Sequence, residues 1–459
     1  MRGPIIFMVV GLVLGLGALA QGSRVEGYRG IWFSLGQFST FGDKYSGGLG
    51  TYTANHIPMA IYSKAANKTF FVYGGTAQAD RRELQIMLSY FDHQKGTVPR
   101  PCIVYEKKEV DDPHDNPSIS IDDKGFIWVF ISGRNTRRPG LIYKSHQPYQ
   151  IDSMVHIKTM EITYPQPWYI QGKGFFHFYT RYTKGRELYW SSSLDGTTWK
   201  QENKLAGFGG HYQLSAAHDG KVFSVFNYHP GGDVDKRTNV YVVYSDDMGA
   251  SWKNIQGKAL NIPLSSPQNE ALVKDFQQEG KLVYLNDIHI DKEGNPVLLA
   301  VVSRHHQPGP QGDPREWMVI QYKKGRWEFN TVCTSTHNYD MGSLYVEEKT
   351  WKIIGPTEPG PQPYGTGGEM ACWESNDQGK TWEKKYMLTH NSTKNHSYAR
   401  RPLHAHKDFI AFWADGNADT FSASSLYFAN SSGEVFQLPY DMKYEEEKPI
   451  RLKRALDQP

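Results

Sequence analysis

The octapeptide Ser375-Asn376-Asp377-Gln378-Gly379-Lys380-Thr381-Trp382 has the pattern S-x-D-x-G-x-T-W of a tight hairpin turn. Asp377 can accept hydrogen bonds from the backbone N–H groups of the turn, and Gly379 can adopt the positive φ that the turn needs. Trp382 can fill apolar space between two sheets. The pattern recurs at Ser245–Trp252 and, one residue shorter, at Ser193–Trp199. Three copies of one turn indicate an internal repeat, and we expect the three tryptophans to be buried between repeated sheets.

Composition narrows the class of fold. The chain has 459 residues, of which 14% are aromatic and 22% charged, with 44 glycines and 25 prolines. Aromatic residues favour strands, and glycine and proline favour the turns between them. Closed all-β architectures run long, so we expect a single domain. The net charge is only +3 and no Lys/Arg run is present, so we expect no nucleic-acid partner.

The N-terminus has the features of an export signal. Arg2 precedes an apolar run from Ile5 to Leu19, and Ala18-Leu19-Ala20 is a small-residue cleavage pattern. The run is short for a membrane-spanning helix. We therefore expect a signal peptide over residues 1–20, export to the periplasm or the extracellular medium, and no membrane association after cleavage. A retained anchor is the alternative.

The cysteines and histidines do not form a recognisable metal motif. Cys102, Cys333 and Cys372 are too few and too scattered for a disulfide framework or a CxxC site, although one disulfide is possible in an oxidising compartment. We interpret His404-Ala405-His406 as strand alternation rather than as a ligand pair. No metal and no cofactor are expected.

A unit of lead-in residue, short strand, tight turn and second strand recurs seven times. The second unit runs from His114 through the strand Ser118–Ile121 and a turn to the strand Phe126–Ile131. The seven lead-in residues are His56, His114, Tyr164, His211, His289, His337 and Tyr398. Such units are typical of the four-stranded blades of β-propellers.

The predicted fold is therefore an all-β, single-domain, seven-bladed β-propeller over residues 21–445. We expect the first strand, around Ile31, to pair with the last blade near Leu426–Ala429 and close the ring. The charged segment 446–459 is expected to be a frayed C-terminal tail.

The repeat also predicts where functional side chains gather. A residue that leads into an inner strand lies at one mouth of the central channel, and the second strand returns to the same mouth. Histidine, tyrosine and arginine dominate these positions, with hardly a carboxylate. The candidate catalytic residues are His114, His211, Tyr212 and Tyr228, and the candidate substrate-binding residues are His56, Arg134, Tyr179, Arg181, His229, Arg304, His305 and Arg401.

Such a mouth suits an anionic polysaccharide or oligosaccharide. Arginine binds carboxylate or sulfate through paired hydrogen bonds, whereas few Asp or Glu residues are placed to act as the paired acids of most glycosidases. We expect β-elimination at a uronic acid, in which histidine or tyrosine removes the C5 proton and protonates the O4 leaving group. Arginine then stabilises the charge that grows on the carboxylate. For any single histidine, a structural hydrogen bond to a neighbouring blade is an equally good interpretation.

The stretches Asp112–Ile119 and Phe226–Pro230, with the three turns, resemble the BNR-4 repeat group, whose turns are called Asp boxes. This group holds exported bacterial propellers that include ulvan lyases and enzymes acting on rhamnose–glucuronic acid linkages. The segment Lys44–Thr76 is most similar to the rhamnosyl-glucuronate lyases, which remove rhamnose caps from arabinogalactan side chains. The resemblance implies a secreted polysaccharide lyase.

The resemblance also suggests one catalytic residue. In ulvan lyases a histidine on a D-x-H-x-N-P-type motif acts with a tyrosine, and His114 matches that histidine. A second histidine of those enzymes is Arg134 here, so the proton relay differs. The motif does not identify the tyrosine, for which Tyr212, Tyr228 and Tyr179 are candidates in that order.

Two other classes of function fit the same features. A related propeller family of α-L-rhamnosidases relies on one histidine, a role for which His56 is the candidate. A propeller of this kind could also bind glycans without catalysis. A sialidase is disfavoured because the early R-I-P motif that sialidases often carry is missing.

Overall fold

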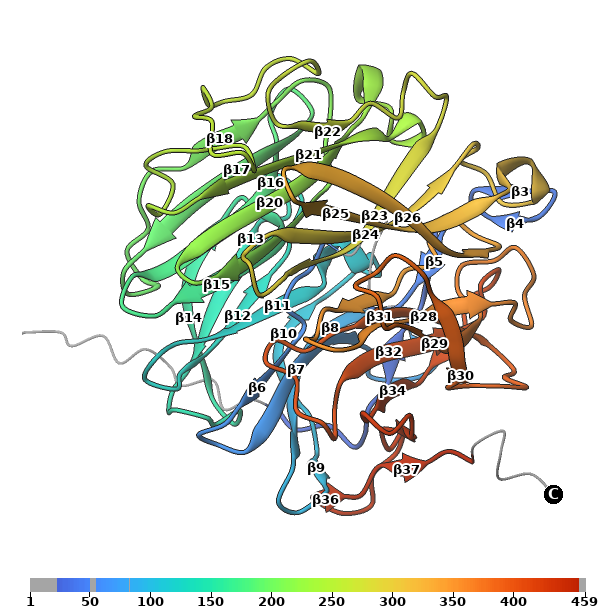
Figure 1. Cartoon of the computed structure of the whole chain (residues 1–459). Helices are drawn as coiled ribbons and strands as arrows, with labels where there is room; N and C mark the ends of the chain where they lie inside the picture. The colour runs from blue at the N-terminus through green and yellow to red at the C-terminus, as the bar shows by residue number, and fades with distance from the viewer. Residues whose placement is uncertain (1–22, 50–54, 82, 454–459) are drawn as a thin grey trace, which may run out of the picture.

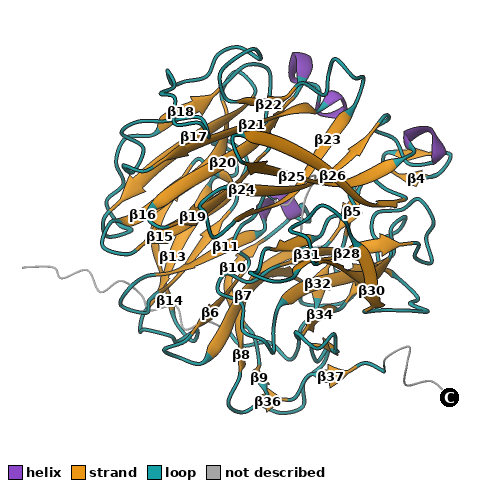
Figure 2. Ribbon diagram, in the orientation of Figure 1, coloured by secondary structure: helices purple, strands orange, loops and turns teal. Residues whose placement is uncertain are grey.

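The computed structural model describes residues 23–49, 55–81 and 83–453, so the predicted signal peptide lies outside the described residues. Seven antiparallel sheets follow one another along the chain around a common centre (Figure 1). Almost all regular structure is strand, and the helices are single 3-10 turns (Figure 2). The fold is the predicted seven-bladed β-propeller. No helix among the described residues is long and apolar enough to cross a membrane.

The first four blades use the strands that the recurring unit predicts, followed by two outer strands. Blade 1 contains β6 (Ala60–Ser63), β7 (Lys68–Gly75), β8 (Leu84–Asp92) and β10 (Cys102–Lys107); blade 2 contains β11 (Pro117–Ile121), β12 (Ile127–Ile131), β13 (Gly140–Ser145) and β14 (Met154–Met160); blade 3 contains β15 (Thr163–Ile170), β16 (Gly174–Tyr182), β17 (Arg186–Ser193) and β18 (Asn203–Ala206); blade 4 contains β19 (Gln213–His218), β20 (Lys221–Tyr228), β21 (Thr238–Ser245) and β22 (Leu272–Lys274).

The remaining blades repeat this order, and blade 7 has an added outer strand. Blade 5 contains β23 (Leu282–Ile290), β24 (Pro296–Ser303), β25 (Arg315–Lys323) and β26 (Arg326–Ser335); blade 6 contains β27 (Ser343–Tyr345), β28 (Trp351–Glu358), β29 (Glu369–Ser375) and β30 (Glu383–Met387); blade 7 contains β31 (Asn395–Arg400), β32 (Ala411–Gly416), β34 (Leu426–Ala429), β35 (Val435–Gln437) and β37 (Ile450–Arg451).

Short elements connect or flank the blades. They are β1 (Gly30–Ile31), β2 (Phe33–Ser34), β3 (Phe38–Ser39), β4 (Gly42–Asp43), β5 (Ser46–Gly47), β9 (Val98–Pro99), β33 (Ala423–Ser424) and β36 (Glu446–Glu447), with the 3-10 turns η1 (Pro113–Asp115), η2 (Pro230–Gly232), η3 (Val234–Lys236) and η4 (Pro310–Gly312).

The ring closes where the two ends of the chain meet. β1 pairs with β33 and, at Gly30, with β7 of blade 1. The predicted partner of the first strand was wrong by a few residues, because β34 already lies between β32 and β35. On the inner side, Leu403 forms a parallel bridge with Ile61. The blue and red ends of the chain lie side by side in Figure 1.

The C-terminal segment is paired further than predicted. Glu446 and Glu447 pair with Pro99 and Val98, and Ile450 pairs with Gln437. The open edge of β35 offers backbone hydrogen bonds, and these stabilise the paired conformation although the segment is charged. The residues up to Arg451 are therefore in strands, and the predicted boundary at 445 does not mark the start of a frayed tail.

Two inner strands lie differently from the prediction. In blade 5 the inner strand begins at Leu282 and absorbs Asn286 at a β-bulge between Leu285 and Asp287. His289 therefore lies near the end of that strand, at the opposite mouth. In blade 7 the inner strand is β31, so the predicted lead-in residue Tyr398 lies within that strand and not ahead of it.

The three Asp boxes join the third and fourth strands of blades 3, 4 and 6. In the last of them, Asp377 Oδ1 accepts from the backbone N–H groups of Lys380 (3.1 Å) and Thr381 (2.9 Å). All three tryptophans pack between blades, as predicted; Trp252 is 3% exposed, and Trp199 and Trp382 are half-buried. Each box therefore fastens its blade to a neighbour.

The apolar core is divided among the seams between blades. One cluster joins Phe176 and Trp190 of blade 3 to Phe226 of blade 4, and others join blades 1 and 2, 6 and 7, and 7 and 1. The cysteines are also in this interior. All three are unpaired, and burial raises the pKa of Cys102 to about 12.

We predict that Gly196→Ala in the first Asp box lowers the free energy of unfolding by about 2 to 3 kcal/mol. Gly196 has φ +74°, and an added Cβ would lie 2.4 Å from the ring of Trp128. Gly172→Ala is the matched control, because Gly172 has φ +73° with nothing within 4 Å. Urea denaturation should show a loss of only about 1 kcal/mol for the control. Equal losses would contradict packing against Trp128.

Candidate active site

One aromatic ring from each blade lies near the start of its inner strand. These rings are His56, His114, Tyr164, Tyr212, Tyr284, Tyr339 and Tyr398. Tyr45, from the segment before blade 1, joins the set with a ring centroid 5.0 Å from that of Tyr339. We call this set the aromatic ring of the first mouth, meaning the mouth at which the inner strands begin.

Tyr164 lies at the centre of one side of this ring. Its ring centroid is 5.7 Å from those of His114 and Tyr212 and 5.6 Å from that of His56. Its hydroxyl has no hydrogen-bond partner among the described residues, and burial raises its pKa well above the ordinary value. The phenol is therefore held in its protonated form.

The backbone explains how Tyr164 reaches this position. Tyr164 has φ +56°, and the ladder shifts register between Thr163 and Gln166. A non-glycine residue with a left-handed backbone conformation is strained, and at a β-bulge this conformation redirects the side chain. Such residues are frequent at functional sites. The Ser132 hydroxyl holds the strained residue by accepting from the Tyr164 N–H at 3.0 Å.

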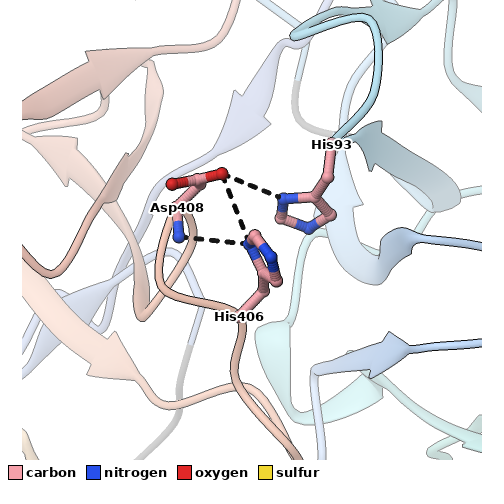
Figure 3. Close-up of side chains that lie close together, drawn as sticks. All are labelled: His93, His406 and Asp408. Atoms are coloured by element: carbon pink, nitrogen blue, oxygen red, sulfur yellow. Dashed lines mark hydrogen bonds and ion pairs between the residues drawn. The ribbon is translucent and has the colours of Figure 1, made fainter.

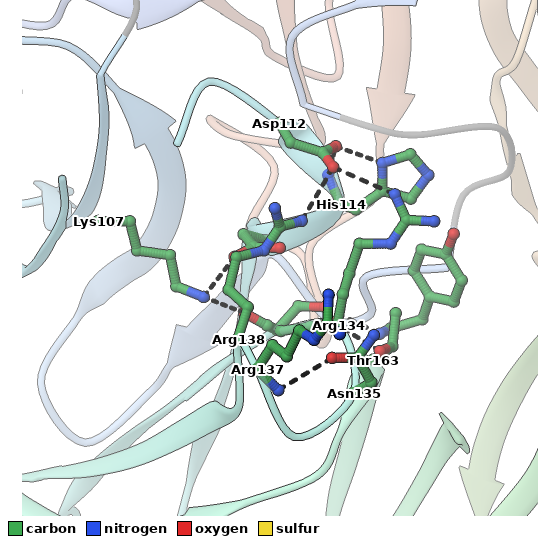
Figure 4. Close-up of polar contacts among 12 residues, drawn as sticks. Lys107, Asp112, His114, Arg134, Asn135, Arg137, Arg138 and Thr163 are labelled. Carbon is green, nitrogen blue, oxygen red and sulfur yellow. Dashed lines mark hydrogen bonds and ion pairs between the residues drawn. The ribbon is translucent and has the colours of Figure 1, made fainter. Parts of the chain in front are cut away.

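His114 is positioned by Asp112 through the short turn η1 (Figure 4). Asp112 caps the turn by accepting from the backbone N–H of His114 at 3.0 Å, and the same carboxylate oxygen binds His114 Nδ1. Pro113 at the first position of the turn fixes its φ. The carboxylate therefore selects the tautomer with the proton on Nδ1 and the lone pair on Nε2.

A buried ionic network supports this pair. Arg138 binds Asp112 at 2.9 Å and Asp115 at 2.9 Å, and Lys107 Nζ binds Asp115 at 2.5 Å (Figure 4). Burial alone would raise the pKa of Asp112, but His114 and Arg134 hold it well below the ordinary value. Asp112 is therefore a permanent anion that orients His114, and the prediction of a mouth with hardly a carboxylate was wrong at this position.

Two partly exposed arginines lie at the ring of Tyr182, and one of them, Arg134, also contacts Asp112. Arg134 Nη1 lies 3.4 Å from Asp112 Oδ2, and its guanidinium is 5.6 Å from the ring of Tyr182. Arg186 lies 5.9 Å from the same ring and 5.8 Å from the ring of Tyr212. Both guanidinium groups thus lie within 6 Å of the ring of Tyr182.

Arg237 is a third cation of this mouth and is completely buried. Its guanidinium lies 4.4 Å from the ring of Tyr284, 5.0 Å from that of Tyr212 and 5.2 Å from that of Tyr339. It donates to Tyr339 Oη at 2.9 Å and to the Val234 carbonyl at 2.8 Å. Aromatic faces and these acceptors replace the water that a buried cation loses.

His211, predicted to be catalytic, has a structural position. Its Nδ1 donates to the Asn227 carbonyl at 2.9 Å, and its Nε2 accepts from the Phe208 N–H at 3.2 Å. Burial lowers its pKa to about 4. Backbone groups occupy both ring nitrogens. The ring therefore cannot accept a substrate proton at Nε2 without losing its hydrogen bond from the Phe208 N–H.

The neighbouring candidates divide between the mouth and the seam. His229 is fully buried, and its ring centroid lies 4.8 Å from that of Tyr212. Tyr228 packs against Phe208 instead, with centroids 5.5 Å apart. Strand alternation explains the difference, because consecutive residues point to opposite faces. His229 therefore supports the aromatic ring, and Tyr228 does not join it.

Tyr179 and Arg181 lie outside the first mouth. Tyr179 is buried in the seam between blades 2 and 3, against His177 and Tyr189. Arg181 is bound by two carboxylates, Glu202 at 2.5 Å and Glu161 at 2.6 Å. A guanidinium that is already neutralised twice is a poor receptor for a substrate carboxylate.

The remaining candidates are spread over three places. Arg304 is exposed and His305 stacks on His306, both on the loop after β24. His56 Nε2 donates to the His114 carbonyl at 3.1 Å, and the ring lines a cavity of about 40 Å³. Such a cavity holds about three water molecules and is too small for a sugar ring. Arg401 lines the opposite mouth with His289.

The sequence reasoning missed Asp112, Tyr182, Arg186 and Arg237. Tyr182 and Arg186 flank the tight turn around Gly185, which joins the second and third strands of blade 3, and the predicted unit ended with the second strand. Asp112 stands two residues before His114 in a motif that was recognised only for its histidine. Arg237 gave no signal, because it lies just before the third strand of blade 4, whereas the predicted pattern covered the first two strands of each blade.

The fold and this mouth define a propeller whose channel is lined by histidine, tyrosine and arginine. The family model described as BNR repeat-containing family member, BNR_4, matches residues 80–352, more than half of the chain. The chain therefore belongs to the BNR_4 family, as its repeats and motifs predict.

Individual relatives are distant in sequence. An ulvan lyase from Nonlabens ulvanivorans is 21% identical over 333 residues, a match that covers 61% of this chain and 66% of that enzyme. A PL25 ulvan lyase solved with bound -[GlcA(1-4)Rha3S]- has a TM-score of 0.68 at 14% identity, covering 89% of this chain and 95% of the other. A second PL25 ulvan lyase structure gives the same score and identity, with 96% of that chain covered. These structures share the fold of this chain.

The buried histidines predict an acid-sensitive fold. Burial lowers the pKa of His177 to about 3, so between the unfolded pKa of about 6.5 and that value only the unfolded chain binds the proton. Stability is therefore lost as the pH falls through this window. Burial raises the pKa of Asp340 to about 7, which acts in the opposite direction between about pH 4 and 7, but His56, His211 and His337 add to His177.

We predict that His177→Phe lowers the slope of the free energy of unfolding against pH by about 1.4 kcal/mol per pH unit near pH 5. This slope corresponds to about one proton fewer taken up on unfolding. His177 is surrounded by the rings of Phe130, Tyr179 and Trp199, so phenylalanine fits its neighbours. Urea denaturation at pH 5, 6 and 7 measures the slope. A variant with the same slope as the parent chain would contradict a neutral His177.

Proposed function

We propose that this protein is a polysaccharide lyase that cleaves the bond to O4 of a uronic acid by β-elimination. The observation that carries the proposal is the pair Asp112–His114, which lies beside the protonated phenol of Tyr164 and between basic groups. An oriented base, a neighbouring acid and partly exposed guanidinium groups are the three parts that this reaction needs.

Each side chain has one step in the proposed reaction. Arg134 and Arg186 pair with the uronate carboxylate and stabilise the negative charge that develops when C5 loses its proton. His114 accepts that proton at Nε2, and Asp112 stabilises the imidazolium that forms. The C5–H electrons form the C4=C5 double bond, the C4–O4 bond breaks, and the Tyr164 hydroxyl gives its proton to O4.

A hydrolase mechanism fits the same mouth less well. Asp112 and Asp115 are both held by cations, and the pKa of Asp112 is too low for a general acid. Glycosidases of the usual kind need one carboxyl group that stays protonated. His56, the candidate for a rhamnosidase-type mechanism, faces a cavity too small for a sugar ring.

The substrate class follows from charge and from the relatives. Arg186 forms no ion pair with a described carboxylate, and Arg134 has only the 3.4 Å contact with Asp112, so both partly exposed guanidinium groups favour a substrate carboxylate. The relatives are an ulvan lyase and a PL25 lyase with bound GlcA–Rha3S units. We propose rhamnose-α-1,4-glucuronate linkages, of arabinogalactan-type glycans or of ulvan, as the bonds cleaved. The N-terminal segment supports export to the periplasm or the medium, where such polymers occur.

We predict that His114→Ala lowers the turnover of a rhamnose–glucuronate polymer by 100-fold or more, the order of magnitude that a general base contributes. The assay is the ultraviolet absorbance of the unsaturated uronate, which only elimination produces. Thermal unfolding should change little, since η1 is capped by the carboxylate of Asp112 and not by the imidazole. Near-normal turnover would place the base elsewhere, and an unfolded variant would make His114 structural.

We predict that Arg134→Ala lowers kcat/KM for the native polymer by about 100-fold, whereas Arg181→Ala lowers it by less than about threefold. Both are partly exposed arginines at the end of a second strand, but only Arg181 is already bound by two glutamates. Carboxyl-reduced polymer should be cleaved by neither variant nor by the parent enzyme. Equal losses in the two variants, or cleavage of the reduced polymer, would refute carboxylate binding at Arg134.

A further inference from the structure

Three side chains with metal-binding atoms lie together on the face of the propeller opposite the first mouth (Figure 3). His93 follows the last residue of β8 in blade 1, and His406 and Asp408 lie in the loop between β31 and β32 of blade 7. Their nitrogen and oxygen atoms are all within 4.8 Å of one another. The cluster therefore spans the seam between the first and last blades.

The surroundings of His93 orient its ring for a ligand. The side chain is only 1% exposed, and its Nε2 binds Thr69 Oγ1 at 2.8 Å. When Nε2 donates its proton to this hydroxyl, Nδ1 carries the lone pair. Nδ1 faces Asp408 Oδ2 at 3.8 Å and has no hydrogen-bond partner among the described residues. A buried lone pair without a donor is costly, so it indicates an electrophilic ligand.

The distances fit a tetrahedral transition metal. His406 Nδ1 lies 3.4 Å from Asp408 Oδ2, compared with the 3.8 Å from His93 Nδ1. Bonds of about 2.0 to 2.1 Å place two tetrahedral ligands about 3.3 to 3.5 Å apart. His406 Nδ1 also accepts a long contact of 3.3 Å from the Asp408 N–H, which a metal ion would replace. Asp408 is 45% exposed, so water can fill a fourth position.

The donor set selects among cations. Two imidazoles and one carboxylate suit Zn²⁺, whereas Ca²⁺ takes six to eight oxygen ligands.

We propose that His93, His406 and Asp408 bind one Zn²⁺ ion that fastens blade 1 to blade 7 at the closure of the ring. The loop is already docked on blade 1, since Tyr62 N–H donates to the Leu403 carbonyl at 2.9 Å. The ring of Tyr62 also touches both histidines, with centroids 5.2 Å and 4.9 Å away. An ion that binds only the closed ring shifts the equilibrium toward it.

The test uses the full chain, stripped of metal with a chelator and then titrated with Zn²⁺ or Ca²⁺. Calorimetry should give one Zn²⁺ per chain. The melting temperature should rise by about 3 to 5 °C when free Zn²⁺ exceeds Kd by about 100-fold, and Ca²⁺ should have no effect. Absence of Zn²⁺ binding, or an equal response to Ca²⁺, would overturn the proposal.

Variants locate the ion. His406→Ala and Asp408→Asn should each lower the Zn²⁺ affinity by about 100-fold or more, and Thr69→Val, which removes the partner of His93 Nε2, by about 10- to 100-fold. The control is His156→Ala, which removes an exposed histidine of blade 2 whose Nε2 contacts Thr159 at 3.1 Å. It should bind Zn²⁺ like the parent chain.

A second readout separates a metal ligand from a structural contact. With the chelator present, His406→Ala and Asp408→Asn should melt at the same temperature as the parent chain, because their effect acts through the ion. Variants that melt lower with chelator and bind Zn²⁺ unchanged would overturn the proposal, since the cluster would then act only by packing. Because neither residue lies at the first mouth, lyase activity at low temperature should remain.

Discussion

The rest of the structure depends on the closure of the ring. No blade can bury its faces alone, because the apolar clusters lie in the seams and each draws its members from neighbouring sheets. Successive blades are joined by the chain itself, but blade 7 is not followed in the sequence by blade 1. This seam is therefore closed by non-covalent contacts. β1 bridges it by pairing with both β33 and β7, and Phe71 packs on Phe409 across it.

Closure also builds the first mouth. Each blade contributes one aromatic residue near the start of its inner strand. The seven inner strands surround one axis, so these rings come into contact only when the ring of blades is closed. Arg237 becomes tolerable at full burial because three tyrosine faces and two oxygen acceptors surround it. The strained backbone of Tyr164 in blade 3 is held by the hydroxyl of Ser132, which follows the second strand of blade 2. The site is therefore a property of the assembled ring and of no single motif.

The fold was predictable because its signals are local and repeated. Each Asp box specifies its own turn through the hydrogen bonds of one aspartate, and strand patterns between turns give the blade count. The site was predictable only in part. His114 and Arg134 both contact Asp112 at the first mouth, where the sequence pattern of blade 2 places them. His211 was misassigned because a sequence cannot show that the Asn227 carbonyl and the Phe208 N–H occupy both of its ring nitrogens.

Contacts between segments far apart in the sequence were the features that the sequence predicted least well. Arg181 is as basic in sequence as Arg134, and only the structure shows the two glutamates that neutralise it. His289 was placed at the wrong mouth because a β-bulge in β23 absorbs polar residues that look like the end of a strand. The role of a side chain that depends on partners far away in the sequence thus cannot be predicted from a local sequence pattern.

The most direct measurement is a crystal structure of the His114→Ala variant with a rhamnose–glucuronate oligosaccharide. The proposed mechanism predicts the uronate carboxylate within hydrogen-bonding distance of the guanidinium groups of Arg134 and Arg186, with C5 facing the space left by the imidazole and O4 near the Tyr164 hydroxyl. A carboxylate bound at Arg181 or Arg304, or a sugar held at the opposite mouth, would contradict it.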